Sequence, residues 1–165
     1  MSAQRALVLG AAGQLGQACM DCTPETVVAE GFSRATCDVT DDAALRRVMD
    51  DIDPHVVINA AAYTAVDAAE DDPQSADAVN ADAPAMLGAL CAQRGLRLVH
   101  ISTDFVFDGR APRPYAPGAN PSPGYLWCEQ VAGRAGRRAR CERSNRFADL
   151  SQGSRRGLLV VGTSW

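Results

Sequence analysis

The sequence predicts an α/β protein built on a doubly wound parallel sheet. Short apolar runs, typical of strands buried on both faces, alternate along the chain with segments whose apolar residues recur every three or four positions. Such alternation with short turns is characteristic of right-handed βαβ units. At 165 residues and 47% hydrophobic content, the chain is long enough for one domain of this kind and short for two.

The first βα unit carries the strongest signal. Ala6–Leu9 is an unbroken apolar run that predicts a buried strand, and Gly10, Gly13 and Gly16 follow it. Glycine tolerates positive φ in the turn, lets a pyrophosphate approach the backbone, and lets the next helix pack close to the strand. The spacing indicates dinucleotide binding at the helix N-terminus. An ordinary glycine-rich βα turn is the alternative.

The next elements leave the type of dinucleotide open. Gln14 to about Cys22 reads as a helix, and Thr26–Glu30 reads as the second strand. An acidic residue at the end of this strand, Glu30, would hold a ribose diol, as in NAD sites. Arg34 would instead pair with a 2′-phosphate, as in NADP sites. Both readings stay open.

A second amphipathic helix follows. Its apolar residues have three- and four-residue spacing, Thr40 is placed to cap it, and Asp53-Pro54 stops it. The apolar residues are Leu45, Val48, Met49 and Ile52.

The third strand, His55–Asn59, precedes a run of small residues. Ala60–Thr64 reads A-A-A-Y-T, and small residues beyond the carboxyl end of a strand let a ligand lie against the backbone. Tight loop packing explains the same residues equally well.

Two helical segments come next. Pro73 to Val79 is the first segment, and Pro84 restarts a helix that runs to Arg94 and ends at Gly95. The apolar face of these segments comprises Val79, Met86, Leu87 and Leu90.

The fourth strand, Leu96–Ile101, ends in hydroxyl residues. Ser102 and Thr103 stand at its carboxyl end and are candidates for ligand contacts, although a strand-end turn would use the same side chains. His100 lies inside the strand pattern, so we expect a core histidine with its hydrogen bonds satisfied.

Charge is distributed unevenly along the chain. Residues 1–109 hold 17 acidic residues against 6 arginines, a net charge of −11, whereas residues 110–165 hold 3 acidic residues against 10 arginines, a net charge of +7. Every one of the 16 basic residues is arginine. An arginine-rich tail can bind nucleic acid, but few aromatic residues are interleaved with these arginines, so we expect no nucleic-acid partner.

The composition also indicates the cellular location of the protein and the redox state of its cysteines. No apolar stretch approaches the length that spans a bilayer and no leader precedes the first strand, so we expect a soluble, cytoplasmic protein without membrane association. The six cysteines fall mostly in regular elements and predict reduced thiols. Cys19-x-x-Cys22 has no second pair and no neighbouring histidine, so we expect no metal there.

Taken together, several motifs resemble the N-terminal half of the dTDP-4-dehydrorhamnose reductase family. They are G-A-A-G-Q-L-G, C-D-V-T-D, V-V-I-N-A-A-A-Y-T-A-V-D-A-A-E, V-N-A and L-V-H-I-S-T-D-F-V-F-D-G, in order over Arg5 to about Pro123. Members are extended short-chain dehydrogenase/reductases that reduce a 4-keto sugar on a thymidine nucleotide. The resemblance implies a Rossmann-like domain with NADPH or NADH, and it leaves both a role for Mg²⁺ and a homodimer open.

The resemblance also implies site residues. It places Gly10 and Gly16 in the glycine turn, Gly13, Gln14 and Leu15 on the pyrophosphate, Asp38 and Val39 near the adenine, and Ala62, Tyr63, Thr64 and Ile101 along the nicotinamide half. It implies that Thr103 helps to polarise the 4-keto oxygen of the sugar. Thr103 and Asp104 would contact the sugar, as would Trp165 in G-T-S-W, which is similar to the family's R-T-S-W.

One part of the family pattern is missing. The family uses a Tyr-x-x-x-Lys to deliver a proton, but Tyr125 is followed four positions later by Glu129, and the chain has no lysine. An adjacent carboxylate raises the pKa of a tyrosine, so Tyr125 is a doubtful proton donor and we expect impaired catalysis.

The arginine-rich segment 124–156 has no clear strand. Read one base forward from Leu126, its codons permit Y-G-x-S-K-L-x-G-E, the pattern of the family. Our hypothesis is a frameshift, in the gene or its sequencing, that is undone before Leu158–Val161, where a strand is expected; a real basic helix is the alternative. The domain prediction is therefore a dinucleotide-binding domain at 1–123, an anomalous segment at 124–156, and a core strand at 157–165, before the smaller substrate lobe.

Two functions from different classes follow. The first is NAD(P)H-dependent reduction of a dTDP-4-keto-6-deoxy sugar in dTDP-rhamnose biosynthesis, impaired in this chain. The second is a non-catalytic dinucleotide-binding or regulatory module of the same fold.

Overall fold

A five-stranded parallel sheet forms the centre of the protein, for which the computed structural model describes residues 3–103 and 158–163. Its strand order is β2-β1-β3-β4-β5. The strands are β1 (Gln4–Leu9), β2 (Val27–Phe32), β3 (Val56–Asn59), β4 (Arg97–Thr103) and β5 (Leu158–Thr163). The fifth strand expected at Leu158–Val161 is thus present and pairs in parallel with β4.

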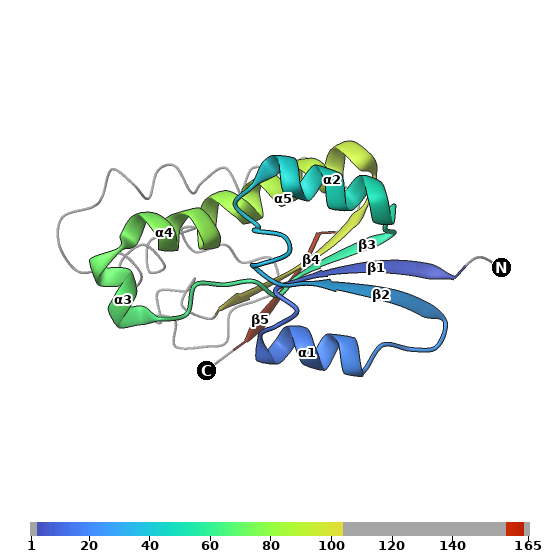
Figure 1. Ribbon diagram of the computed structural model, residues 1–165, viewed down its shortest axis with the longest axis horizontal. Coiled ribbons are helices and arrows are strands. Elements are labelled where there is room, and N and C mark those ends of the chain that lie inside the picture. Colours follow the sequence, from blue (N-terminus) through green and yellow to red (C-terminus); the bar gives the residue numbers. More distant parts are fainter. Residues whose placement is uncertain (1–2, 104–157, 164–165) are drawn as a thin grey trace, which may run out of the picture.

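Helices cover both faces of this sheet, which confirms the doubly wound α/β class (Figure 1). The helices are α1 (Gln14–Asp21), α2 (Asp42–Ile52), α3 (Val66–Asp71), α4 (Pro73–Asp77), the π-helix η1 (Ala78–Asp82) and α5 (Ala83–Arg94). In Figure 1, α1 lies below the sheet, whereas α2 and α5 lie above it.

The strand order reverses beside β1. From β1 the chain passes to β2 on one side and then returns to β3 on the other side of β1. Doubly wound sheets bind ligands outside the carboxyl ends of the strands at such a reversal. The loops that follow β1, β2 and β3 therefore meet where a ligand site is expected.

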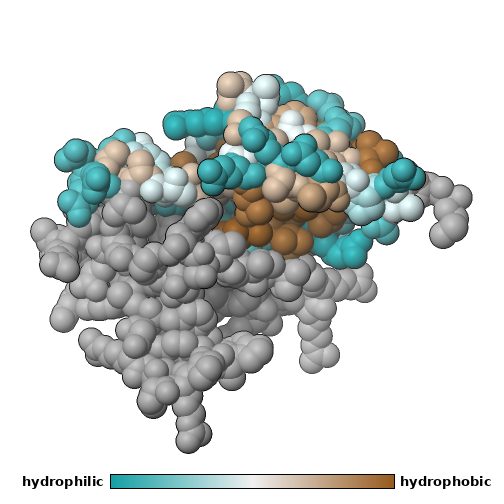
Figure 2. Space-filling view, turned by 90° about the horizontal axis from the view of Figure 1, so that it is seen from below, coloured by the Kyte–Doolittle hydropathy of each residue, from teal (hydrophilic) through white to brown (hydrophobic). Residues whose placement is uncertain are grey.

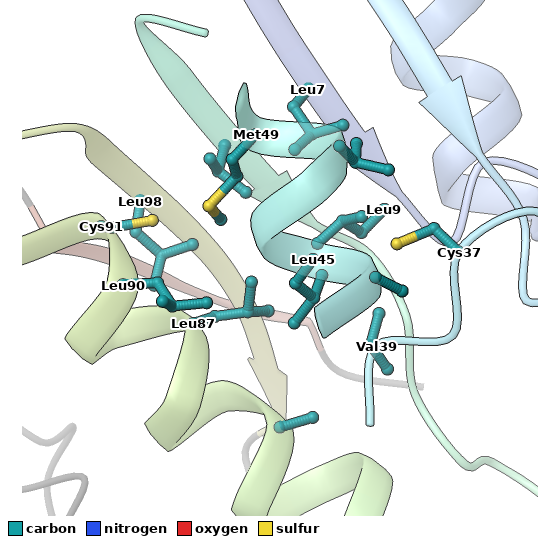
Figure 3. Close-up of a cluster of buried hydrophobic side chains, with 14 of the residues drawn as sticks. Leu7, Leu9, Cys37, Val39, Leu45, Met49, Leu87, Leu90, Cys91 and Leu98 are labelled. Carbon is teal, nitrogen blue, oxygen red and sulfur yellow. The ribbon is translucent and has the colours of Figure 1, made fainter. Parts of the chain in front are cut away.

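The main core lies between the sheet and the upper helices (Figure 3). Figure 3 shows Leu45 and Met49 of α2 directed at the side chains of β1, with Leu87 and Leu90 of α5 beside them. The buried face of α2 comprises Leu45, Val48, Met49 and Ile52, as their spacing predicted. Packing of this face fixes α2, and with it the loop that leads from β2 to α2.

The cap of α2 differs from the sequence-based expectation. Asp41, not Thr40, is the N-cap, and its Oδ1 accepts hydrogen bonds from the backbone N–H groups of Ala43 and Ala44. The Thr40 hydroxyl instead donates to Asp38 Oδ1 at 2.7 Å. Either residue type can cap a helix, and a carboxylate gains further from the positive end of the helix dipole. At the other end Asp53 adopts φ 46° and closes the helix before Pro54.

The helical region after β3 is also different from the prediction. The segment Val66–Asp71 forms the helix α3, for which the sequence analysis predicted no element. From Pro73 to Arg94 the chain is helical without a break, because η1 joins α4 to α5. Pro84 therefore does not restart a helix: it is the second residue of α5 and follows directly on the wider turn of η1. Gly95 ends the run in the left-handed conformation, as expected.

Figure 2 views the molecule from below Figure 1 and shows hydrophobic residues gathered in the lower middle of the described surface, with hydrophilic residues around and above them. Among the residues that the structure describes, no helix combines the length and apolar character needed to cross a membrane. The four cysteines in this part of the chain, Cys19, Cys22, Cys37 and Cys91, are free thiols.

Candidate functional site

A pocket of about 230 Å³ opens at the strand reversal. Its wall is built from the loops after β1, β2 and β3 together with one residue of η1. The lining residues are Gly10, Ala12, Gly13, Ser33, Arg34, Cys37, Asp38, Val39, Ala60, Ala61, Ala62, Tyr63 and Val79. The position is the one that the strand order predicts for a ligand.

The glycine turn forms the middle of this wall. Gly10 has φ +78°, and a Cβ there would lie 2.6 Å from the backbone nitrogen of Ala61. A Cβ on Gly16 would lie 2.2 Å from the carbonyl oxygen of Gly10. Both glycines are therefore required by the fold itself, because neither position has room for a side chain.

Gly13 differs from the other two glycines. A Cβ there would meet only the Gly10 carbonyl oxygen, at 3.4 Å, so the protein leaves this position open towards the pocket. Gly13 is the N-cap of α1, no side chain caps the helix, and its first turn holds no acidic residue. An anion can thus approach the positive end of α1 without competition from a side chain.

The end of the pocket next to β2 is charged. Arg34 extends its guanidinium into solvent and pairs with Asp38, with 3.5 Å between Nε and Oδ2. The hydrogen bonds that the backbone N–H and the hydroxyl of Thr40 donate to Asp38 keep the pKa of its carboxyl below the usual value, and Arg34 adds to this effect. Glu30 is exposed and is not part of the lining. Of the two residues that could distinguish NAD from NADP, Arg34 is the one at the pocket.

The end next to β3 is held by two asparagines. Asn59 is buried, and its Oδ1 accepts from the backbone N–H of Ala61 at 3.1 Å. Asn80 accepts from the backbone N–H of Tyr63 at 2.7 Å and donates to the Tyr63 carbonyl at 2.9 Å. These bonds fix the loop that supplies Ala60–Tyr63 to the pocket.

His100 supports the first of these asparagines. Its Nδ1 lies 3.2 Å from Asn59 Nδ2, which confirms the expectation of a satisfied histidine. Burial lowers the pKa of His100 to about 4, so the ring is neutral at pH 7 and its Nδ1 can accept a hydrogen bond from the Asn59 side-chain amide.

This pKa predicts a pH-dependent stability. Because the folded-state pKa lies below the ordinary value near 6.5, unfolding takes up a proton between these pH values, and stability falls as the pH drops from 6.5 towards 4. Between pH 7 and pH 5 we expect the free energy of unfolding of the wild type to fall by about 2 kcal/mol more than that of His100→Gln. Urea denaturation at both pH values measures the difference, and equal losses in the two proteins would contradict the assigned cause.

The structure gathers six of the predicted cofactor residues at the pocket. These are Gly10, Gly13, Asp38, Val39, Ala62 and Tyr63. The other predicted cofactor residues are outside the lining: Gln14, Leu15 and Gly16 belong to α1, Thr64 is exposed, and Ile101 is half-buried in β4.

The predicted substrate residues are placed less completely. Thr103 is the last residue of β4, in register with Thr163 of β5, so its backbone is at the carboxyl edge of the sheet. Asp104, Tyr125 and Trp165 lie outside the described residues.

Four lining residues were not singled out from the sequence as site residues: Ala12, Ser33, Cys37 and Val79. Val79 had been assigned only to an apolar helix face. Cys37 is buried, and desolvation raises the pKa of its thiol, with the nearby carboxylates of Asp41 and Asp38 adding to the effect. It is therefore a neutral wall residue at pH 7. Among the described residues, no cluster of three or more His, Cys, Asp or Glu side chains could hold a metal ion.

These features fit a dinucleotide. An open glycine precedes an uncapped helix, an arginine flanks it on the β2 side, and small alanines line the β3 side. The first suits a pyrophosphate, the second a 2′-phosphate, and the third a flat ring lying against the backbone.

Comparison with known proteins decides the family. The model of the family described as "RmlD substrate binding domain" matches residues 4–132 of this chain. The chain belongs to this family.

The curated proteins similar to this member of the RmlD family include reductases of nucleotide sugars. The dTDP-4-keto-6-deoxy-D-glucose reductase of Streptomyces niveus is 43% identical over 122 residues, which are 72% of this chain and 42% of that protein. The dTDP-4-dehydrorhamnose reductase of Mycobacterium tuberculosis H37Rv is 42% identical over 125 residues, which are 73% of this chain and 40% of that protein. The chain thus spans well under half the length of these relatives.

Solved structures agree with this placement. The dTDP-4-dehydrorhamnose reductase of Bacillus anthracis, solved in complex with NADP, matches with a TM-score of 0.78 at 29% identity, over 98% of this chain and 53% of that one. The Clostridium acetobutylicum enzyme matches with a TM-score of 0.77 at 28% identity, over 98% of this chain and 54% of that one. The resemblance expected from the motifs is confirmed, and the fold is the Rossmann-like fold of these reductases.

Proposed function

We propose that this RmlD family chain is the NADPH-binding part of a reductase for a dTDP-4-keto-6-deoxy sugar. The pocket at the strand reversal carries the proposal, because it combines an open glycine turn with Arg34 at the β2 side. The names of the relatives supply the substrate class: they reduce dTDP-linked keto sugars. The dinucleotide-binding domain extends over residues 1–123.

Each part of the pocket has a proposed role. The backbone around Gly13, Gln14 and Leu15, at the N-terminus of α1, holds the pyrophosphate by its N–H groups. Arg34 pairs with the 2′-phosphate, and Asp38 and Val39 flank the adenosine. On the β3 side, Ala62–Thr64 and Ile101 face the nicotinamide half. When bound, the nicotinamide supplies the hydride for the keto carbon of the sugar.

The substrate side is proposed from the family alone. Thr103, at the carboxyl edge of β4, donates a hydrogen bond to the keto oxygen, and Asp104 and Trp165 contact the sugar. The chain contains no lysine that could lower the pKa of Tyr125, so we propose that proton delivery is slow and that turnover is weak. We also propose that the protein acts in the cytoplasm and forms a homodimer.

Cofactor binding and turnover are tested separately. We expect the purified chain to bind NADPH more tightly than NADH in a fluorescence titration, and to oxidise NADPH slowly when a dTDP-4-keto-6-deoxy sugar is added. Binding of NADPH without any oxidation favours the second candidate, a non-catalytic dinucleotide-binding module, for which the missing lysine is the specific observation. A folded chain that binds neither nucleotide would contradict both functions.

A further inference from the structure

The side chain of Asn80 forms hydrogen bonds with both the backbone N–H and the backbone carbonyl of one residue in the pocket wall, Tyr63. Its side-chain oxygen accepts from the Tyr63 N–H at 2.7 Å, and its side-chain nitrogen donates to the Tyr63 carbonyl at 2.9 Å. Only a planar amide offers one acceptor and two donors side by side, so this pairing requires Asn or Gln, and Gln is one methylene longer. We propose that Asn80 is a positioning residue, which sets the backbone of Tyr63 and through it the β3 side of the dinucleotide pocket.

The surroundings of Asn80 support a specific role for it. Asn80 is the central residue of η1, a π-helical stretch in the run from Pro73 to Arg94. Such stretches are rare and occur often at functional sites. Ala76 before η1 and Ala83 after it are both buried, so the helical run is anchored on each side of the wider turn. Asn80 is thus presented to the loop from a fixed support.

The contacted loop has little other support. Residues 60–65 carry no helix or strand, and Tyr63 is half-buried. Asn59 holds the beginning of this loop through Ala61, whereas Asn80 holds it at Tyr63. Without Asn80, the N–H and carbonyl of Tyr63 lose these partners, and the loop can adopt other conformations.

The pocket geometry limits the effect to one half of the ligand. This step rests on the proposed function, in which the 2′-phosphate and the adenosine lie near Arg34 on the β2 side and the pyrophosphate lies at Gly13. Tyr63 lines the opposite, β3 side. The loop therefore contacts the nicotinamide half, and its displacement leaves the adenosine half untouched.

Two ligands separate these halves. Adenosine 2′,5′-bisphosphate contains the adenosine half alone, whereas NADP⁺ contains both halves. For Asn80→Ala we expect the Kd of NADP⁺ to rise about tenfold, with the Kd of adenosine 2′,5′-bisphosphate within about twofold of the wild type, as measured by isothermal titration calorimetry. Ser75→Ala is the matched control: it removes a side-chain hydrogen bond to Asp72 from the same helical run, away from the pocket, and both Kd values stay unchanged.

Asn80→Asp provides a second test with almost the same side-chain shape. The introduced carboxylate accepts from the Tyr63 N–H but faces its carbonyl without a proton to donate. The facing carbonyl oxygen disfavours the charged form and raises the pKa of this carboxyl, and protonation supplies the missing donor, so the ratio of the NADP⁺ Kd of Asn80→Asp to that of the wild type falls as the pH is lowered from 8 to 5. The Kd of adenosine 2′,5′-bisphosphate for the same variant should show no such dependence, whereas a general loss of folding would change the Kd of both ligands.

The outcomes are distinct. Failure of the wild type to bind NADP⁺ overturns the proposed function and this inference with it. A wild type that binds NADP⁺, combined with Asn80→Ala that binds both ligands as well as the wild type, overturns the role of Asn80 alone. Equal weakening of both ligands also overturns it, because the effect would then be general and not confined to the β3 side.

Discussion

Gly16→Ala is expected to remove much of the folding stability of this protein, lowering the free energy of unfolding by about 3 kcal/mol or more. The added Cβ would lie 2.2 Å from the carbonyl oxygen of Gly10 and 2.6 Å from the Cα of Ala11. Both are backbone atoms in the tight turn between β1 and α1, so neither can rotate away. Domains of this size are stable by only about 5–15 kcal/mol, so a loss of this size is readily measured by urea denaturation.

Gly13→Ala is the matched control for this prediction. Its Cβ would meet a single atom at 3.4 Å, so we expect the free energy of unfolding to stay within about 1 kcal/mol of the wild type. The methyl group would nevertheless occupy the place at which a pyrophosphate approaches, so NADPH affinity should fall. Stability lost at Gly16 and binding lost at Gly13 would separate the two roles of glycine in one turn. Equal stability of both variants would contradict this division.

Arg34→Gln is expected to lower the preference for NADPH over NADH by roughly tenfold to a hundredfold. The guanidinium lies at the β2 side of the pocket with most of its surface exposed, and Asp38, at 3.5 Å, leaves donors free for a phosphate. The variant should bind NADPH weakly and NADH as the wild type does. Titrations of both nucleotides at constant salt measure this ratio.

Arg46→Gln serves as the control for charge. Arg46 pairs with Asp42 four residues earlier, as Arg34 pairs with Asp38 four residues later, but it is exposed on α2 and outside the pocket lining. It changes net charge by the same amount, so its nucleotide preference should equal that of the wild type. If the two variants lose the same preference, the effect is long-range electrostatics and Arg34 has no direct contact with the 2′-phosphate.

Local patterns were sufficient to predict most of the sheet and the glycine turn. The apolar run at β1 and the spacing of Leu45 and Met49 on α2 are set by neighbours in sequence, and the structure has both elements at the expected places. The cap of α2 was wrong by one residue, since Thr40 and Asp41 are both good capping types and the choice depends on the backbone path after β2.

The parts that sequence reasoning missed depend on contacts between distant residues. Asn80 and Tyr63 are 17 positions apart, and their pairing joins a side chain to a backbone, which leaves no periodic trace. Likewise, the contact of Asn59 with His100 joins the neighbouring strands β3 and β4, whose pairing brings together residues 41 positions apart. Val79 was expected on a helix face, whereas it lies in the π-helix η1 and lines the pocket as well. Arg34 was recognised as one of two alternatives, and the structure distinguishes them by position.

The placement of β5 has a consequence for the order of assembly. Strands β1 to β4 are joined by connections that fall within residues 10–96, whereas residues 104–157 separate β4 from its partner β5. Closing a loop of that length costs the unfolded chain about 3 kcal/mol of entropy, more than the shorter connections do. The four-stranded unit already contains every residue that lines the pocket, so we expect it to form first and β5 to pair with β4 in a later step.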